Sequence, residues 1–354
     1  MRDRYYSLLQ ILGCIGVIAY HSRMPGVTLG WTAVELFFAL AAINMFRNLS
    51  FEMSFWEFTR KRYQRLILLI VLVVPFSAII GYHAHLQATG WFFCLGPLLL
   101  HNFISFRIVD WINGDIVWIP LWFLGALFQL QLLAFIFRHA LKQAPIFLLI
   151  VTSVLIGTIG RLLVWKFLTS GNSFLSIVEA TSLFWSPFCH VEVFVFSTLI
   201  TLRGTNFGKF LFPILGAVVI AGTINAYATN LNFSALGFPP GLPNYFQFLW
   251  GYPLLALLFA SLVDPNNALS RWIIQRRFSS RTDFTVGYLS RATGYAYAIH
   301  GSVLFLLWKI PSWRIPLSSH APMYDVVITG MAIVISFLFA AALHGLIKRI
   351  LTRS

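Results

Sequence analysis

Charged side chains are scarce in this sequence: Asp, Glu, Lys and Arg together make up 10% of its 354 residues. An ordinary soluble globular protein holds about 25%. Acidic residues are the scarcest, with 11 against 25 basic ones, while hydrophobic residues supply 58% of the chain. The mean hydropathy is +0.79. This composition excludes an ordinary soluble protein, and we expect an all-α polytopic membrane protein.

Cysteine is rare as well. Cys14, Cys94 and Cys189 all lie inside apolar segments, which favours free thiols that pack as small hydrophobic groups over disulfides. No metal-ligand spacing appears, so we expect no metal site. The formal net charge of +14 would suggest nucleic acid in a soluble domain, but basic cytoplasmic loops explain it more simply. We therefore expect membrane lipids and no nucleic acid as partners.

No internal repeat, low-complexity run or soluble domain is visible, so residues 1–354 are expected to form one integral-membrane domain. Arg2 and Arg4 precede an apolar run, as in a signal peptide, but no small-residue cleavage site follows. We expect an uncleaved first span.

Eleven apolar segments are candidates for membrane spans. They are residues 7–25, 30–46, 66–83, 91–106, 118–137, 146–167, 181–202, 210–229, 246–263, 285–308 and 323–346.

The distribution of basic residues selects among these candidates. Four loops and both termini hold 18 of the 25 Lys and Arg residues, and the positive-inside rule assigns them to the cytoplasm. The chain must then cross an even number of times between residues 65 and 138. Segment 91–106 is short, is broken by Gly96-Pro97 and carries His101-Asn102. We expect it to dip in from the outer face as a re-entrant segment, which leaves about ten transmembrane helices with both termini cytoplasmic.

Two ionisable side chains stand out near the N-terminus. His21 ends an apolar run in which residues 5–20 carry no charge, and Glu35 lies about one turn into the next apolar helix. A short turn joins the two helices, so they are expected to run antiparallel and to bring both groups within about 5 Å of the same depth. Ionisable groups inside a bilayer are costly and tend to mark functional sites. The sequence predicts a proton-sharing pair, although a histidine that only bonds a backbone carbonyl fits the position as well.

The same residues carry a family resemblance. Ile15-Gly-Val-Ile-Ala-Tyr-His21 followed by Gly30-Trp-Thr-Ala-Val-Glu-Leu-Phe-Phe38 resembles the opening of the acyltransferase-three family, multispan bacterial proteins that O-acylate glycans. Phe58-Thr-Arg-Lys-Arg-Tyr-Gln-Arg65 resembles the RxxR entry to the third helix of that family. The resemblance implies an enzyme of the bacterial inner membrane that takes its acyl group from cytosolic acyl-CoA, with acetyl-CoA as the expected donor.

The chemistry of acyl transfer suggests roles for these residues. Arg62 and Arg65, with Lys61 or Arg60, are candidates to hold the phosphates of the acyl donor, since guanidinium binds phosphate bidentately. Positive-inside topology alone would also explain these cations. We expect His21 to act as general base, with Glu35 orienting its imidazole. Whether the acyl group passes directly or through acyl-His21 stays open.

A later stretch, Leu289-Ser-Arg-Ala-Thr-Gly-Tyr-Ala-Tyr-Ala-Ile-His300, resembles the late signature of the family, with Tyr297 and His300 in register. Residues 187–196, with Glu192, resemble its mid-chain Arg-Phe-x-Glu-Phe segment more weakly. We predict that His300, Tyr297 and Glu192 bind the acceptor substrate; for His300, support of the cavity is the alternative.

The sequence also departs from the family pattern. Gln10 stands where the family often has Arg, and Leu121-Trp-Phe-Leu-Gly-Ala-Leu127 lacks the serine and glutamate of the SxxxE motif of the fifth helix. Both changes remove polar groups from the expected site.

Two functions are consistent with these features. The first is an O-acyltransferase, with acetyl as the expected group, that acts on an exported polysaccharide or a lipid-linked glycan. The second is a transporter or exporter of a glycan or lipid-linked sugar, which fits the spans and the intramembrane ionisable residues but lacks visible inverted repeats.

Overall fold

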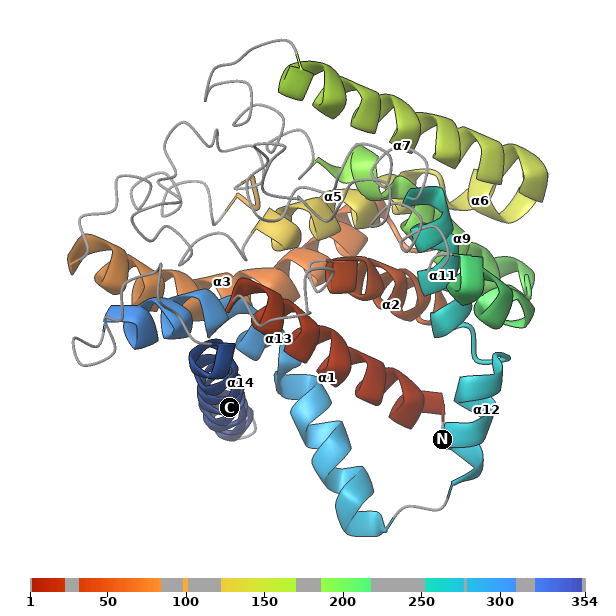
Figure 1. Cartoon of the computed structure of the whole chain (residues 1–354). Coiled ribbons are helices and arrows are strands. Elements are labelled where there is room, and N and C mark those ends of the chain that lie inside the picture. Colours follow the sequence, from red (N-terminus) through yellow and green to blue (C-terminus); the bar gives the residue numbers. More distant parts are fainter. Residues whose placement is uncertain are drawn as a thin grey trace.

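The computed structural model describes residues 2–22, 32–83, 98–100, 122–169, 186–217, 252–276, 279–309 and 322–351. Within these ranges the chain is helical and contains no strand (Figure 1). The helices are α1 (Arg2–His21), α2 (Ala33–Arg47), α3 (Phe55–His83), α5 (Trp122–Ile136), α6 (Arg138–Gln143), α7 (Ile146–Thr169), α9 (Val191–Arg203), α11 (Tyr252–Val263), α12 (Ala268–Gln275), α13 (Ser280–Lys309) and α14 (Pro322–Leu351). Two short 3₁₀ segments, Pro187–His190 and Gly208–Phe210, complete this part of the chain.

Two described helices contain a stretch that is long and apolar enough to cross a membrane, Ile146–Val164 in α7 and Asp325–Ile347 in α14. The helices Trp122–Ile136 and Gly208–Ala217 are apolar but shorter. The all-helical fold class is therefore confirmed, while the count of about ten spans stays a prediction. The re-entrant segment 91–106 lies outside the described residues except for residues 98–100.

Helices α1 and α13 run parallel to each other. Four side-chain contacts join them in rising order along both helices: Arg4–Asp283, Gln10–Ser290, Cys14–Thr293 and His21–His300. Helix α14 runs antiparallel to α13, because Tyr288 near the start of α13 donates to the Ala341 carbonyl near the end of α14. The start of α14 accordingly lies beside the end of α1, where the hydroxyls of Ser22 and Thr329 are 2.6 Å apart.

Helices α3 and α5 run antiparallel. Phe58 stacks on Phe135 at 4.2 Å between ring centroids, and Tyr63, further along α3, meets Phe128, which lies earlier in α5. The chain therefore enters α5 at the end of the bundle where it left α3. This agrees with the even number of crossings that the basic loops predict for this part of the chain.

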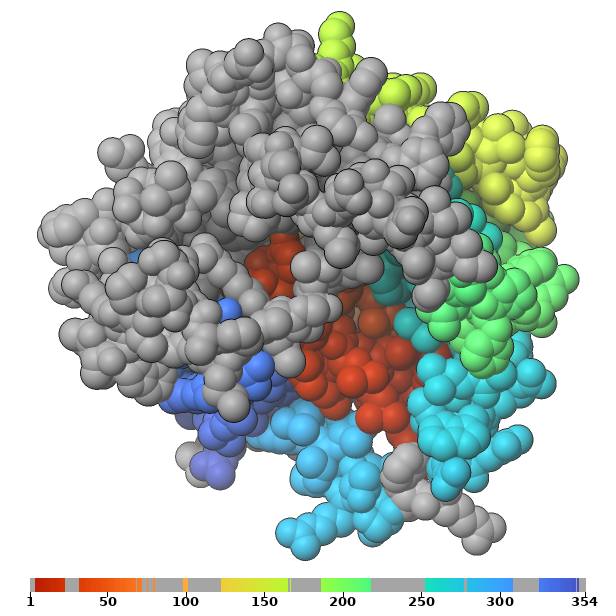
Figure 2. Space-filling model, in the orientation of Figure 1, coloured from red at the N-terminus to blue at the C-terminus, as the bar shows by residue number. Residues whose placement is uncertain are grey.

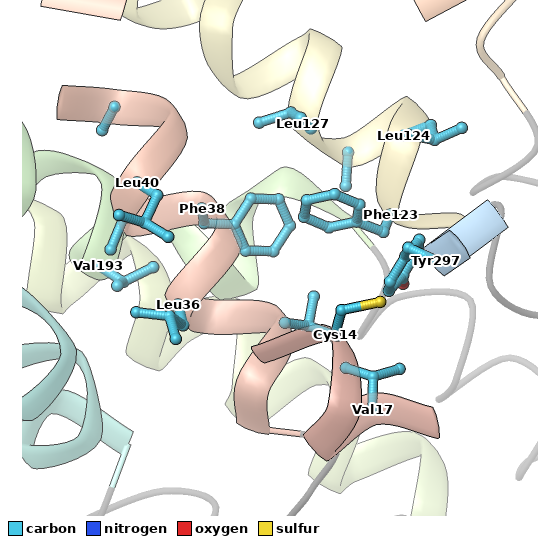
Figure 3. Close-up of a cluster of buried hydrophobic side chains, with 14 of the residues drawn as sticks. Cys14, Val17, Leu36, Phe38, Leu40, Phe123, Leu124, Leu127, Val193 and Tyr297 are labelled. Carbon is cyan, nitrogen blue, oxygen red and sulfur yellow. The ribbon is translucent and has the colours of Figure 1, made fainter. Parts of the chain in front are cut away.

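The core of the bundle is built from α1, α2, α5, α9 and α13. Figure 3 shows Phe38, Phe123 and Tyr297 from three different helices facing one another within a shell of aliphatic side chains. Figure 2 shows atoms of the N-terminal helices at the centre of one face, between the cyan of α12 and the blue of the C-terminal helices. The helices that carry the predicted site residues are thus the ones around which the others pack.

Candidate functional site

The first polar site is a pair of histidines, His21 at the end of α1 and His300 in α13. Nδ1 of His21 lies 2.6 Å from Nε2 of His300, and the two rings are nearly parallel, at 7°. Because α1 and α13 run parallel in register, they bring the two imidazoles to the same level. We refer to these two residues as the histidine pair.

The two rings differ in exposure. His300 is fully buried, at 0% exposure, whereas the side chain of His21 is partly exposed. Tyr20 and Tyr297 provide ring contacts on either side of the pair. His21 is therefore the more accessible of the two residues.

The second polar site surrounds Glu35 in the first turn of α2. Oε1 of this carboxylate lies 2.6 Å from Nδ1 of His190 and accepts a hydrogen bond from the hydroxyl of Tyr252, the first residue of α11. His190 closes the 3₁₀ turn that leads into α9. All three side chains are almost completely buried.

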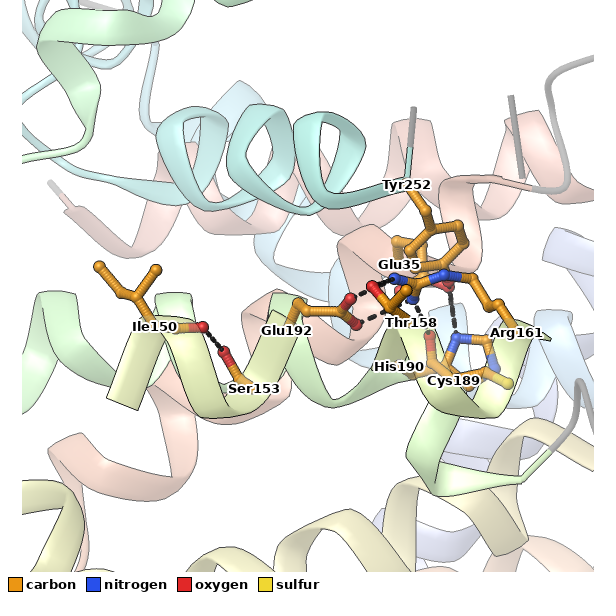
Figure 4. A network of polar contacts seen from close by, with 9 residues as sticks. All are labelled: Glu35, Ile150, Ser153, Thr158, Arg161, Cys189, His190, Glu192 and Tyr252. Carbon is orange, nitrogen blue, oxygen red and sulfur yellow. Dashed lines mark hydrogen bonds and ion pairs between the residues drawn. The ribbon is translucent and has the colours of Figure 1, made fainter. Parts of the chain in front are cut away.

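A buried ion pair adjoins this carboxylate. Arg161 of α7 donates from Nη1 to Oε2 of Glu192 at 3.0 Å and from Nη2 to Oε1 at 2.5 Å, and both residues are 0% exposed. Nη1 also donates to the Cys189 carbonyl, and the guanidinium lies over the Tyr252 ring at 4.5 Å from its centroid. Figure 4 shows these groups converging from different helices. We call Glu35, His190, Tyr252, Arg161 and Glu192 the buried charge cluster.

A glycine makes room for this ion pair. A Cβ built on Gly157, one turn before Arg161 in α7, would overlap the carboxylate of Glu192. Helices α7 and α9 therefore approach closely here, and the carboxylate occupies the space that any side chain at position 157 would need.

Aromatic side chains separate the two polar sites. Phe38 lies 4.9 Å from His190 and 4.8 Å from Phe123, measured between ring centroids. Tyr297 then lies 5.3 Å from Phe123 and 5.6 Å from His300. The rings of Phe38, Phe123 and Tyr297 thus form a chain of contacts from His190 of the buried charge cluster to His300 of the histidine pair.

The structure corrects one expectation about the catalytic groups. His21 and Glu35 do not form a pair: the partner of His21 is His300, and those of Glu35 are His190 and Tyr252. The prediction rested on depth alone, and two groups at one depth on neighbouring helices can still face different neighbours. The role of Glu35 as the group that orients His21 stays a prediction that this arrangement does not support.

The residues expected to bind the acceptor are buried. Glu192 and His300 are 0% exposed and Tyr297 is 3% exposed. Both oxygens of Glu192 are engaged by Arg161. Acceptor binding by these three residues stays a prediction that this arrangement does not support.

Sequence reasoning missed three members of the buried charge cluster. Arg161 did carry a signal, because it is a cation inside an apolar segment and such a charge needs a partner. His190 lies two residues before Glu192, which the sequence had singled out. Tyr252 carried no signal, since a tyrosine at the start of an apolar helix is common at membrane interfaces.

The predicted donor-binding cations lie at the start of α3. Arg62 lies over the Phe58 ring at 5.3 Å, and Arg65 is exposed. Burial and the neighbouring charge of Arg65 lower the pKa of the Arg62 guanidinium to about 10, so it stays protonated at neutral pH. Lys61 points to a different partner, because its Nζ lies 2.7 Å from Oε1 of Glu57. Among the described residues, neither arginine has an acidic partner.

No three side chains of the metal-ligating types gather in the described part of the chain. Cys14 and Cys189 are buried free thiols, and Cys94 lies outside the described residues.

Comparison with known proteins gives one match. The sequence model of a family described as an acyltransferase domain matches residues 3–341, nearly the whole chain. No curated protein and no solved structure matches this chain.

Proposed function

This chain belongs to acyltransferase family 3, and on that premise we propose that it moves an acyl group from cytosolic acyl-CoA to a hydroxyl of an exported or lipid-linked polysaccharide. The match makes the chain an acyltransferase of a membrane-associated family. The acetyl group as the acyl unit, the glycan as the acceptor and the bacterial inner membrane as the location are parts of the proposal.

One observation supports the proposal: the half-buried imidazole of His21 lies within hydrogen-bond distance of the fully buried imidazole of His300. A neutral imidazole near pH 7 accepts the proton of a hydroxyl group as that hydroxyl attacks. His21 also stands in the motif that matches the family opening. We assign to it the general base, or the acyl carrier, of the reaction.

In the proposed step, a ring nitrogen of His21 takes the proton of the acceptor hydroxyl while the hydroxyl oxygen bonds to the thioester carbon. The carbon–sulfur bond then breaks, and the sulfur leaves with the electron pair and gains a proton as the free thiol. In the alternative route the same nitrogen bonds to the acyl carbon first as the carbon–sulfur bond breaks. The acceptor oxygen then bonds to that carbon, the nitrogen–carbon bond breaks, and the hydroxyl proton ends on the sulfur.

Arg62 and Arg65 are proposed to bind the donor phosphates, with Lys61 nearby. Three residues apart, the two arginines share one face of α3. Helix α3 contacts α13 where Leu69 meets Gly294, so about 20 Å of helix separates Arg62 from His300 at 1.5 Å per residue. A donor held by its phosphates must therefore extend along the bundle to present its thioester to the histidine pair.

The test is the acyl content of the polysaccharides in cells that carry His21→Ala. We expect acylation to fall to the level of cells without the protein. His139→Ala, which changes an exposed histidine of α6, is the matched control and should leave acylation intact. Unchanged acylation in His21→Ala at equal protein level would remove the proposal.

A further inference from the structure

One ring nitrogen of His300 faces a group that can only accept a proton. Its Nδ1 lies 2.5 Å from the Tyr297 carbonyl oxygen, one turn earlier in α13. A carbonyl has no proton to give, so Nδ1 of His300 is the donor. In a neutral ring the other nitrogen, Nε2, is then an unprotonated acceptor.

The protonation of His300 also determines which nitrogen of His21 carries its proton. Nε2 of His300 lies 2.6 Å from Nδ1 of His21, so Nδ1 of His21 must carry the proton of that hydrogen bond. The neutral ring of His21 then keeps its lone pair on Nε2. His21 thus donates to His300, and His300 donates to the Tyr297 carbonyl of α13. Because the carbonyl can only accept, it fixes the direction of both hydrogen bonds.

We propose that His300 is a positioning residue that sets the tautomer of His21 and leaves Nε2 of His21 as the reacting nitrogen. The inference rests on the proposed function and changes the part played by His300. Its full burial keeps it from the acceptor, whereas the partly exposed His21 is within reach. His300 thus supplies what a carboxylate supplies to the histidine of a hydrolase triad.

The arrangement works in only one protonation state. If His300 carried two protons, its Nε2–H would donate to Nδ1 of His21, and Nε2 of His21 would hold the hydrogen instead. The lone pair would then be missing from the exposed side of the ring. In the neutral pair, Nε2 of His21 accepts the hydroxyl proton as the oxygen–acyl bond forms, and it then gives that proton to the thiolate released from the broken carbon–sulfur bond, which leaves as the thiol. The imidazolium that forms keeps its hydrogen bond to Nε2 of His300.

Two substitutions separate this role from a structural one. His300→Gln keeps an acceptor atom near the position of Nε2, whereas His300→Leu fills similar space without one. We expect His300→Leu to lower kcat at least about tenfold with little change in KM for the acyl donor, and His300→Gln to recover most of that loss. His344→Leu, a half-buried histidine that packs on Tyr288 of α13, is the matched control and should keep wild-type kcat.

Equal protein level and thermal unfolding are checked for each variant. Wild-type kcat in a folded His300→Leu protein would overturn the proposal. So would a folded His300→Gln protein with the low kcat of His300→Leu, because the acceptor atom alone would then be insufficient.

Nitrogen NMR of ¹⁵N-histidine-labelled protein tests the tautomer without any activity. His21→Gln and His300→Gln assign the signals. We expect a protonated Nδ1 and an unprotonated Nε2 for His21 in the wild type. The opposite tautomer would overturn the proposal. This measurement also distinguishes the two failures: a wild type without acyl transfer defeats the proposed function, whereas the NMR result speaks only to His300.

Discussion

At the level of single residues, the buried charge cluster shows how ionisable groups persist in an apolar bundle. A buried ion pair gains little net stability over an apolar pair, because both ions lose their water. Removing one partner is different, since the remaining charge stays buried and uncompensated. Arg161 and Glu192 meet this condition fully, because both are 0% exposed and they share two hydrogen bonds.

We predict that Glu192→Gln destabilises the protein by about 3–5 kcal/mol, because it leaves the Arg161 guanidinium without its counter-charge. Thermal unfolding in detergent measures the change. Glu57→Gln is the matched control, since Glu57 pairs with Lys61 on an exposed helix surface and its loss should cost no more than about 0.5 kcal/mol. The double variant Arg161→Met/Glu192→Leu should be more stable than Glu192→Gln. Equal effects of Glu192→Gln and Glu57→Gln would contradict this reading.

Gly157→Ala should be nearly as harmful as Glu192→Gln. The new methyl group occupies the space of the Glu192 carboxylate and forces it away from Arg161. The better helix propensity of alanine, about 1 kcal/mol, does not offset that loss. Gly330→Ala in α14 provides the control, because a Cβ there meets nothing within 4 Å. Unfolding temperatures that are the same for both variants would show that α7 and α9 are not in close contact.

Sequence reasoning singled out polar groups of the bundle interior but missed their pairing. It identified His21 and Glu35 as ionisable residues within apolar runs, and His300 and Glu192 through the resemblance to the late and mid-chain segments of the family. It paired His21 with Glu35 because depth along a helix follows from residue number. Partners depend also on the rotation of each helix about its axis, and eleven apolar segments with weak amphipathic patterns do not fix that rotation.

At the level of elements, the sequence predicts where helices lie better than where they begin. The apolar segments 30–46 and 146–167 correspond closely to α2 (Ala33–Arg47) and α7 (Ile146–Thr169). Helix α3 begins at Phe55, eleven residues before the apolar segment, because the basic residues continue the helix beyond the apolar stretch. Helix α12 was missed, since its eight residues lie in a loop assigned only by its charge.

The turn between α11 and α12 is a buried junction. Asn267 caps α12 by accepting from the backbone N–H of Ser270 at 2.6 Å, and its Nδ2 donates to the Leu262 carbonyl and to the Tyr5 hydroxyl of α1. Asp264 accepts from the backbone N–H of Gly208 at 2.8 Å. A Cβ on Gly208 would lie 2.7 Å from the Asn267 backbone nitrogen, so this contact requires glycine.

Asn267→Ala should therefore destabilise the protein by about 2 kcal/mol or more. The helix cap accounts for about 1 kcal/mol, and the lost side-chain donor leaves buried acceptors with fewer partners. Asn266→Ala, at the exposed neighbouring position, keeps the backbone bond to Asp264 and should change stability by less than about 0.5 kcal/mol. Unfolding curves for the two variants decide the matter, and a cost for Asn266→Ala as large as that for Asn267→Ala would count against the junction.

At the level of the whole molecule, helix direction divides the bundle into two ends. Arg203 donates to the Ala144 carbonyl and Arg138 to the Phe51 carbonyl, so the ends of α9 and α5 lie beside the starts of α7 and α3. The histidine pair lies toward the opposite end of α1. We call the end with Arg138 and Arg203 the basic end. A basic end and an opposite end that holds the proposed base, His21, are what a cytosolic donor and an exported acceptor would require.

Cysteine labelling in intact cells tests this division. In a protein without native cysteines, Glu57→Cys and Gln143→Cys should both resist a membrane-impermeant maleimide, because both positions belong to the basic end predicted to face the cytoplasm. A cysteine placed in the uncharged loop 238–243, which lies outside the described residues, should react, because the topology with about ten spans assigns this loop to the outer face. Opposite accessibility of positions 57 and 143 would refute the even number of crossings between α3 and α5.

The same division makes a kinetic prediction about donor binding. If Arg62 and Arg65 hold the donor phosphates, Arg62→Gln/Arg65→Gln should raise KM for acyl-CoA about tenfold or more and leave kcat at saturation nearly unchanged, because each charge-assisted hydrogen bond contributes about 1.5–3 kcal/mol. Acyl-CoA should also protect the variant less well against thermal unfolding. Arg271→Gln, an exposed arginine of α12, is the control for general electrostatics. A rise in KM of the same size in both proteins would mean that the basic end attracts the donor only through its overall charge, and an unchanged KM in the double variant would exclude these arginines from donor binding.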